Sequence, residues 1–126
     1  MLTAHDLVME AKKHIFEVSP EQARGLLGPD MLVLDVREPY EYVEGHIPGA
    51  VNIPRGMLEF KMTQDETLSD RNRQILIYCK TSGRAALSAV ALQTLGYTHV
   101  HSISGGFDAW CDAVLPTDKP EPLSFE

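Results

Sequence analysis

The fold is decided by one continuous stretch, Ile75-Leu76-Ile77-Tyr78-Cys79-Lys80-Thr81-Ser82-Gly83-Arg84, and by the residues that follow it. Its apolar first half is typical of a short strand that is buried on both faces of a sheet. A small polar loop, Lys80–Gly83, comes next. The run Arg84–Leu95 then has high helix propensity and ends at Gly96, a common helix-ending residue. The stretch therefore predicts a buried strand, a tight loop that follows a cysteine, and a helix.

Similar signals occur on both sides of this stretch. Three more short apolar runs predict strands at Ile15–Val18, Met31–Val36 and Val100–Ile103. A helix is predicted to begin at Ser19-Pro20, and the last helix at Phe107, after the Gly105-Gly106 turn. Because strands and helices alternate, we predict an α/β domain with a mainly parallel central sheet and helices on both of its faces.

The 126 residues suffice for one domain with a modest core. We predict that this domain spans residues 15–115. Residues 1–14 before it are predicted to form a short amphipathic helical extension, with Thr3 as its cap. Residues 116–126 after it form a tail in which Pro116, Pro120 and Pro122 prevent a continued helix.

The chain carries 11 Lys and Arg against 18 Asp and Glu, which gives a formal net charge of −7. This charge argues against a general affinity for nucleic acids or for anionic membrane surfaces. The sequence has no run of about eighteen apolar residues, and no basic segment followed by an apolar core at its start. We therefore expect a soluble, cytoplasmic protein.

Two cysteines, Cys79 and Cys111, are too few for a disulfide scaffold, or for a zinc site without histidines. His99 and His101 are expected on one face of a strand, but no histidine has ligand spacing with the cysteines. We therefore predict neither a metal nor another cofactor. In the cytoplasm thiols stay reduced, so a free cysteine is available for chemistry.

Cys79 stands where the predicted strand ends, just before a helix begins. Loop N–H groups and the positive end of the helix dipole stabilise an anion there and favour the thiolate. Gly83 permits a tight turn, while Lys80 and Arg84 add positive charge that can draw in an anionic substrate. The alternative is a buried, inert strand cysteine, but this position favours a nucleophile. Cys111 is interpreted as a packed or surface thiol, the alternative being that it resolves an oxidised Cys79.

Two more residues are expected near the thiol. Asp35 ends its strand at the same sheet edge, where its carboxylate can accept hydrogen bonds from neighbouring loops and hold the frame of the site. It is a poor general base, because a nearby carboxylate opposes thiolate formation. Arg37 either pairs with an acidic neighbour or lines the approach of the anion, and the sequence leaves both interpretations open.

Four motifs follow one another along the chain: LDVREPYEY (Leu34–Tyr42), EGHIPGAVNIPRG (Glu44–Gly56), YCKTSGR (Tyr78–Arg84) and GGFDAW (Gly105–Trp110). In this order they resemble the single-domain rhodaneses, a sulfurtransferase family. The resemblance covers most of the chain, from about Ile15 to Trp110.

The resemblance implies a double displacement. The Cys79 thiolate would take the outer sulfur of thiosulfate or another small anionic donor, release sulfite and keep a persulfide. A thiophilic acceptor would then remove that sulfur: cyanide, glutathione, thioredoxin or the thiol of a sulfur-relay protein. The substrate and the persulfide would be bound by the loop residues Lys80, Thr81, Ser82, Gly83 and Arg84. Ser82 and Ala85 depart from the commonest family pattern, which has glycine and serine there, and this puts rate and donor preference in doubt.

Loop length separates two chemistries that share this fold. Cys79 to Arg84 make six residues, as in rhodaneses, whereas related dual-specificity phosphatases and arsenate reductases have a cysteine, five residues and then arginine. The shorter loop favours a single sulfur atom over a tetrahedral phosphate. Sulfur transfer is therefore the leading hypothesis. A protein-interaction or sulfur-carrier module with little turnover is the second, and a phosphatase or arsenate reductase is the third.

Overall fold

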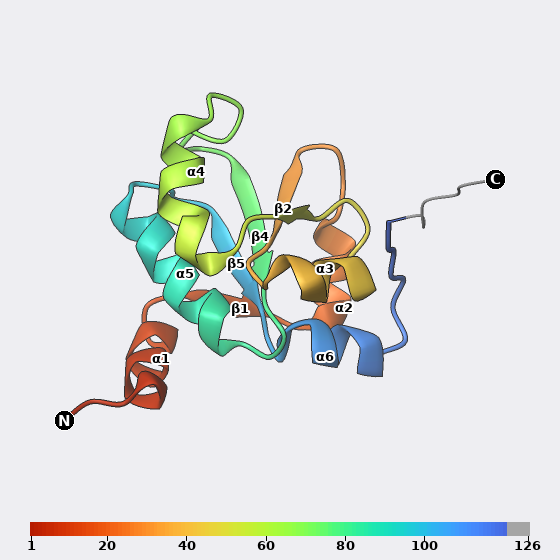
Figure 1. The fold of residues 1–126 in the computed structure, drawn as a ribbon, viewed down its shortest axis with the longest axis horizontal. Coiled ribbons are helices and arrows are strands. Elements are labelled where there is room, and N and C mark those ends of the chain that lie inside the picture. Colours follow the sequence, from red (N-terminus) through yellow and green to blue (C-terminus); the bar gives the residue numbers. More distant parts are fainter. Residues whose placement is uncertain (121–126) are drawn as a thin grey trace.

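A parallel five-stranded sheet forms the centre of the computed structural model, which describes residues 1–120 (Figure 1). Along the chain the strands are β1 (Phe16–Val18), β2 (Met31–Asp35), β3 (Val51–Asn52), β4 (Gln74–Tyr78) and β5 (Val100–Ile103). In the sheet their order is β1-β5-β4-β2-β3, and every neighbouring pair is parallel. β4 is therefore the middle strand, and its carboxyl end lies at the centre of the end of the sheet where all the parallel strands finish.

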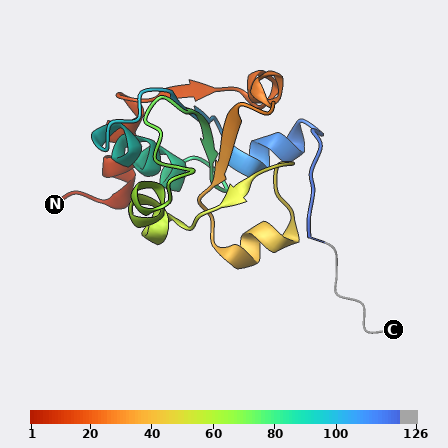
Figure 2. The same ribbon diagram turned by 90° about the horizontal axis from the view of Figure 1, so that it is seen from above.

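Helices cover both faces of this sheet. One side carries α1 (Ala4–Lys12), α4 (Leu58–Gln64) and α5 (Gly83–Thr94), and the other carries α2 (Pro20–Leu26), α3 (Pro39–Glu44) and α6 (Gly106–Asp112). Figures 1 and 2 show these two groups on opposite sides of the strands. The predicted α/β fold with a parallel sheet and two helical layers is confirmed.

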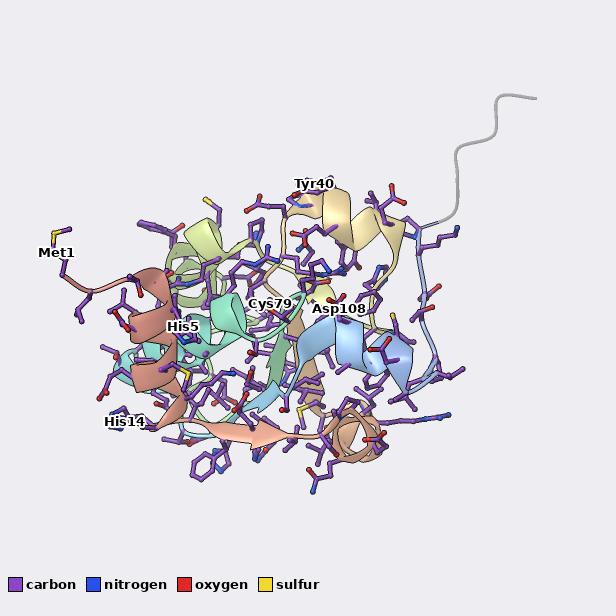
Figure 3. The ribbon with its side chains drawn as sticks, turned by 90° about the horizontal axis from the view of Figure 1, so that it is seen from below. Met1, His5, His14, Tyr40, Cys79 and Asp108 are labelled. Atoms are coloured by element: carbon purple, nitrogen blue, oxygen red, sulfur yellow. The ribbon has the colours of Figure 1, made fainter. Side chains whose placement is uncertain are left out.

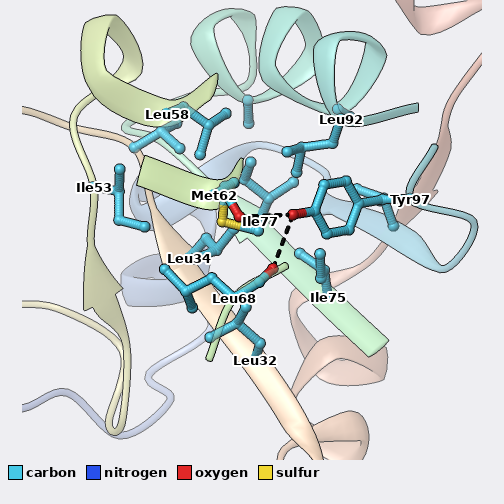
Figure 4. Packing of buried hydrophobic residues seen from close by; sticks show 14 of the residues in the cluster. Leu32, Leu34, Ile53, Leu58, Met62, Leu68, Ile75, Ile77, Leu92 and Tyr97 are labelled. Carbon is cyan, nitrogen blue, oxygen red and sulfur yellow. Dashed lines mark hydrogen bonds between the residues drawn. The ribbon is translucent and has the colours of Figure 1, made fainter. Parts of the chain in front are cut away.

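The central strands β2 and β4 bury side chains on both faces, as their apolar sequences predict. Leu34 of β2 and Ile77 of β4 belong to the core under α4 and α5, which Figure 4 shows. Their chain neighbours Val33 and Leu76 belong to the second core, under α2 and α6. Successive residues alternate between the two cores because side chains in a strand point to opposite faces.

The helix ends follow local sequence signals. Thr3 and Ser19 each accept a hydrogen bond from a backbone N–H of the first turn, which confirms the predicted Thr3 cap and the predicted start of α2. The helix after the cysteine loop begins at Gly83, one residue before the predicted Arg84. Four short elements were not predicted: α3, β3, α4 and the 3-10 turn η1 (Arg55–Met57).

The segment after α6 returns to the domain. Trp110 Nε1 donates to the carbonyl oxygen of Pro116 at 2.8 Å, and the backbones of His46 and Asp118 exchange two hydrogen bonds of 2.8 Å. Residues 116–120 of the predicted tail are therefore seen to run along the domain, whereas residues 121–126 lie outside the described part of the chain. Across residues 1–120, no helix combines the length and the apolar character needed to cross a membrane.

Candidate active site

Cys79 lies at the carboxyl edge of the sheet, directly after the central strand β4. Figure 3 shows it between the start of α5 and the start of α6, close to Asp108. The residue is 1% exposed, and its Sγ accepts a hydrogen bond from the backbone N–H of Ala85, 3.3 Å away in the first turn of α5. The thiol thus faces the N-terminus of a helix of 12 residues, which is the positive end of the helix dipole.

The loop presents backbone donors that the protein itself leaves unused. The N–H groups of residues 80–84 have no hydrogen-bond acceptor within residues 1–120. Ser82, the N-cap of α5, has φ −155°, so serine at this position requires no left-handed backbone. Ala85 has no side-chain hydroxyl group, but its N–H contacts the sulfur. Consecutive free donors at a helix start are suited to hold an anion beside Cys79.

The start of α6 holds the loop from the other side. The N–H of Phe107 donates to the carbonyl oxygen of Cys79 at 2.8 Å, and the N–H of Asp108 donates to that of Lys80 at 3.0 Å. Gly106 has φ +62°, and a Cβ there would overlap the carbonyl oxygens of Thr81 and Cys79. Only glycine lets the helix approach the loop this closely.

Both cations predicted to attract an anion are paired with carboxylates. Lys80 Nζ lies 2.8 Å from Asp108 Oδ2, and Arg84 makes hydrogen bonds of 2.8 and 3.2 Å to the two oxygens of Glu41. The bond from Arg84 is the main cause that lowers the pKa of Glu41, so this carboxylate stays ionised. The positive charge that Lys80 and Arg84 add to the loop is therefore largely balanced.

Sequence reasoning missed Glu41 and Asp108 as members of the site. Both lie in the quoted motifs, Glu41 in Leu34–Tyr42 and Asp108 in Gly105–Trp110. The sequence did carry a signal for both. In a parallel sheet the segments that follow the strands meet at one end of the sheet, so these carboxylates were to be expected near Lys80 and Arg84.

Asp35 and Arg37 form a buried ion pair beside the end of β4. Arg37 Nη2 lies 2.7 Å from Asp35 Oδ2 and also donates to the carbonyl oxygen of Gly45 at 2.7 Å. The hydroxyl of Tyr78 donates to Asp35 Oδ2 at 2.8 Å and accepts from the N–H of Ile47. Burial, together with the Asp35 charge, raises the pKa of Tyr78 well above its ordinary value, so the hydroxyl keeps its proton.

These contacts separate the two interpretations of Arg37. Its side chain is paired with Asp35 and almost fully buried, with the residue 4% exposed, so it does not line an approach path. Asp35 accepts hydrogen bonds from Arg37 and Tyr78 and thereby ties the ends of β2 and β4 together. The pair is placed to hold the frame around the cysteine loop.

Within the described residues, neither Cys111 nor His46 makes a hydrogen bond to Cys79 or to residues 80–84. Cys111 is exposed on α6. Partial desolvation of its sulfur is the largest cause that raises its pKa, and the negative charges of Asp108 and Asp112 raise it further. His46 is buried, with Nδ1 3.0 Å from the carbonyl oxygen of Tyr42, and its ring stacks on the Tyr42 ring. No cluster of three or more His, Cys, Asp or Glu side chains within residues 1–120 is arranged to hold a metal ion.

A cavity of about 480 Å³ lies between α1 and α5. Its walls include Leu7 and Ala11 of α1 and Leu87 and Val90 of α5, and its mostly apolar lining contains neither Cys79 nor a loop residue. The cavity is therefore separate from the candidate nucleophile.

Comparison with known proteins identifies similar sequences and similar solved structures. A "Sulfurtransferase" of Allochromatium vinosum is 32% identical over 73% of this chain and 82% of its own length. A thiosulfate sulfurtransferase of Haemophilus influenzae is 31% identical over 81% of this chain and 93% of its own length. A solved structure from Rhodopseudomonas palustris, described as a "Possible Tyrosine Phosphatase", is 30% identical with a TM-score of 0.87. It covers 94% of this chain and 96% of its own.

The family model of the rhodanese-like domain matches residues 19–113, which run from the cap of α2 to the end of α6 and include all four motifs. This range is well over half of the chain, and the R. palustris structure shares its fold. The chain therefore belongs to the rhodanese-like domain family.

Proposed function

We propose that this protein is a sulfurtransferase that carries sulfane sulfur on Cys79, from thiosulfate or a related small anionic donor to a thiophilic acceptor. One observation carries the proposal. The Cys79 sulfur accepts from Ala85 N–H at the start of α5, and the N–H groups of residues 80–84 beside it have no acceptor within residues 1–120. A persulfide places its negative charge on the outer sulfur, where such donors can stabilise it.

The proposed reaction has two balanced steps. The Cys79 thiolate attacks the outer sulfur of thiosulfate, a new S–S bond forms, and the S–S bond of thiosulfate breaks so that sulfite leaves with the electron pair. In the second step an acceptor, as its thiolate or as cyanide, attacks the outer sulfur of the persulfide and the Cys79 thiolate is restored. Because Cys79 is 1% exposed, the donor must be small and the loop must open to admit it.

Neighbouring groups have supporting roles in this scheme. Asp35 and Arg37 position the strand ends, and Gly106 lets α6 fix the carbonyl groups of the loop. Residues 15–115 are proposed as the transferase domain. A reducing compartment such as the cytoplasm would keep the Cys79 thiol available for the first step.

Three features support sulfur transfer over phosphate hydrolysis. The relatives from A. vinosum and H. influenzae are named as sulfurtransferases, and the six residues from Cys79 to Arg84 form a shorter loop than phosphatases use. In addition, Arg84 is bound to Glu41 through both carboxylate oxygens, which leaves its guanidinium less able to bind a phosphate. The R. palustris neighbour nevertheless makes aryl phosphate hydrolysis a necessary arm of the test.

The direct test is intact mass spectrometry after incubation with thiosulfate. We expect an added mass of about 32 Da, one sulfur atom, on Cys79. The adduct should be lost in Cys79→Ser and retained in the matched control Cys111→Ser, which changes the other cysteine of the chain. An adduct that persists in Cys79→Ser contradicts the assignment of the nucleophile.

A turnover assay separates the three functional hypotheses. Sulfur delivered from thiosulfate to cyanide, glutathione and thioredoxin is measured in parallel, together with hydrolysis of an aryl phosphate. Turnover with at least one acceptor supports the transferase. Negligible turnover with every donor, combined with specific binding of a cellular protein, favours the interaction module. Aryl phosphate hydrolysis that depends on Cys79 favours the phosphatase.

A further inference from the structure

Helix α1 lies directly against the cysteine loop, although it precedes the family-matched residues 19–113. It packs along α5, and Figure 3 shows the two helices side by side. Val8 Cγ2 of α1 lies 3.4 Å from the position that a Cβ on Gly83 would occupy. Helix α1 therefore contacts the residue at which the loop becomes helix α5.

Lys12, the last residue of α1, places its ammonium group against the loop. Its side chain is partly buried, and Nζ donates a hydrogen bond of 2.7 Å to Oγ of Ser82, the N-cap of α5. A hydrogen bond from an ammonium group is stronger than one between neutral groups. The contact joins residues that are 70 positions apart in the sequence, so it belongs to the tertiary structure and not to a local turn.

The partner of Lys12 distinguishes it from the other cations around the loop. Lys80 is paired with Asp108 and Arg84 with Glu41, whereas Lys12 is bound to a neutral hydroxyl group. Within the described residues 1–120, no carboxylate lies within 4.0 Å of Lys12 Nζ. The charge of Lys12 is therefore the one at this loop that no direct ion pair balances.

We propose that Lys12 supplies the net positive charge that draws an anion to the Cys79 loop, and that it positions Ser82 at the same time. Helix α1 thus becomes part of the site, and its lysine favours anionic over neutral reactants. The proposal rests on the proposed function only in taking the natural anion to be the sulfur donor. Its electrostatic part applies to any small anion that reacts with Cys79.

The test compares two alkylating reagents of similar size, iodoacetate, which is an anion, and iodoacetamide, which is neutral. Their rates are measured at Cys79 at one pH in a Cys111→Ser background, so that a single thiol reacts. Both reagents need the same thiolate and the same opening of the loop. The ratio of the two rate constants therefore reports the charge near the sulfur, whereas a change in loop structure alters both rates together.

We expect Lys12→Met to lower the iodoacetate to iodoacetamide ratio about three- to tenfold, and Lys12→Arg to restore most of it. The matched control is Lys13→Met, which removes the same charge from the next residue, where the exposed Lys13 is paired with Glu10. That variant should keep the wild-type ratio. Rising salt should lower the ratio in wild type and change it little in Lys12→Met.

An unchanged ratio in Lys12→Met, or an equal fall in Lys13→Met, would overturn the proposal. The alkylation measurement requires no sulfur transfer, so its outcome is separate from that of the thiosulfate experiment. A lowered ratio without a thiosulfate adduct would leave Lys12 as the anion-attracting residue and refute thiosulfate as the sulfur donor. An adduct with an unchanged ratio would refute the role of Lys12 alone.

Discussion

Replacing Gly106 with alanine tests how strongly the start of α6 constrains the cysteine loop. The added Cβ would lie 2.5 Å from the carbonyl oxygen of Cys79 and even closer to that of Thr81. Both oxygens belong to the backbone, so the overlap is relieved only if α6 and the loop move apart. That movement weakens the hydrogen bonds from Phe107 N–H to Cys79 and from Asp108 N–H to Lys80.

The expected cost follows from these contacts. A left-handed φ costs alanine about 1 to 2 kcal/mol relative to glycine, and each of the two hydrogen bonds contributes about 1 kcal/mol. With the overlap included, we expect Gly106→Ala to lower the free energy of unfolding by about 3 to 5 kcal/mol. Urea denaturation followed by the fluorescence of Trp110, the single tryptophan, measures this loss.

Gly49→Ala is the matched control for the backbone strain. Gly49 also has a positive φ, +80°, but a Cβ there would meet no atom within 4 Å. Its substitution should therefore cost only the strain, about 1 to 2 kcal/mol. If the two variants lose equal stability, the close approach of α6 contributes nothing and the reasoning is wrong. The Cys79 reactivity of Gly106→Ala should fall as well, whereas that of Gly49→Ala should stay at the wild-type value.

Three further predictions concern the buried pair, the Glu41 carboxylate and the second cysteine. Arg37→Met should cost about 3 to 5 kcal/mol in urea denaturation, because it leaves the Asp35 charge buried without a counterion, and adding Asp35→Asn should recover part of the loss. A fully stable Arg37→Met protein would contradict this. Because its bond with Arg84 lowers the pKa of Glu41, this bond stabilises the fold fully at pH values above the ordinary glutamate pKa of 4.5. The stabilisation is lost as the pH falls through the lowered pKa. The stability difference between wild type and Glu41→Gln, less than about 1 kcal/mol at pH 7, should therefore shrink toward pH 3, and a constant difference would count against the pair. Finally, burial raises the pKa of Cys111, so at pH 7 peptide mapping should find it alkylated by iodoacetamide more slowly than free glutathione, and Cys111→Ser should leave sulfur transfer unchanged.

The sequence predicted those elements whose signals span several residues. The strands β2 and β4 each contain four consecutive apolar residues, and most of the 12 residues of α5 have high helix propensity. The missed elements are too short to show the hydrophobic periodicity of a strand or a helix in the sequence. β3 has two residues and pairs only with β2, and α4 buries only Leu58 and Met62. Their structure depends on the tertiary packing that surrounds them.

Sequence also predicted the position of Cys79 between a strand and a helix, but not its electrostatic surroundings. Cys79 could be placed because the end of a buried strand and the start of a helix are local features. The charge balance around the loop could not be predicted, because it depends on residues far apart in the sequence. Arg84 pairs with Glu41, 43 residues away, and Lys80 pairs with Asp108, 28 residues away. Positive residues near a thiol in sequence therefore say little about the net charge there until the folded neighbours are known.

The strand order has a consequence for when the site can exist during synthesis. β1 pairs with β5, the last strand, and the carbonyl groups of Cys79 and Lys80 bond to α6, which follows β5. A nascent chain that has emerged only as far as β4 therefore lacks the sheet partner of its first strand and the helix that fixes its loop. Such nonlocal pairings form slowly. The Cys79 loop becomes organised only when nearly the whole domain has left the ribosome, so incomplete chains lack the helix contacts that hold the carbonyl groups of Cys79 and Lys80.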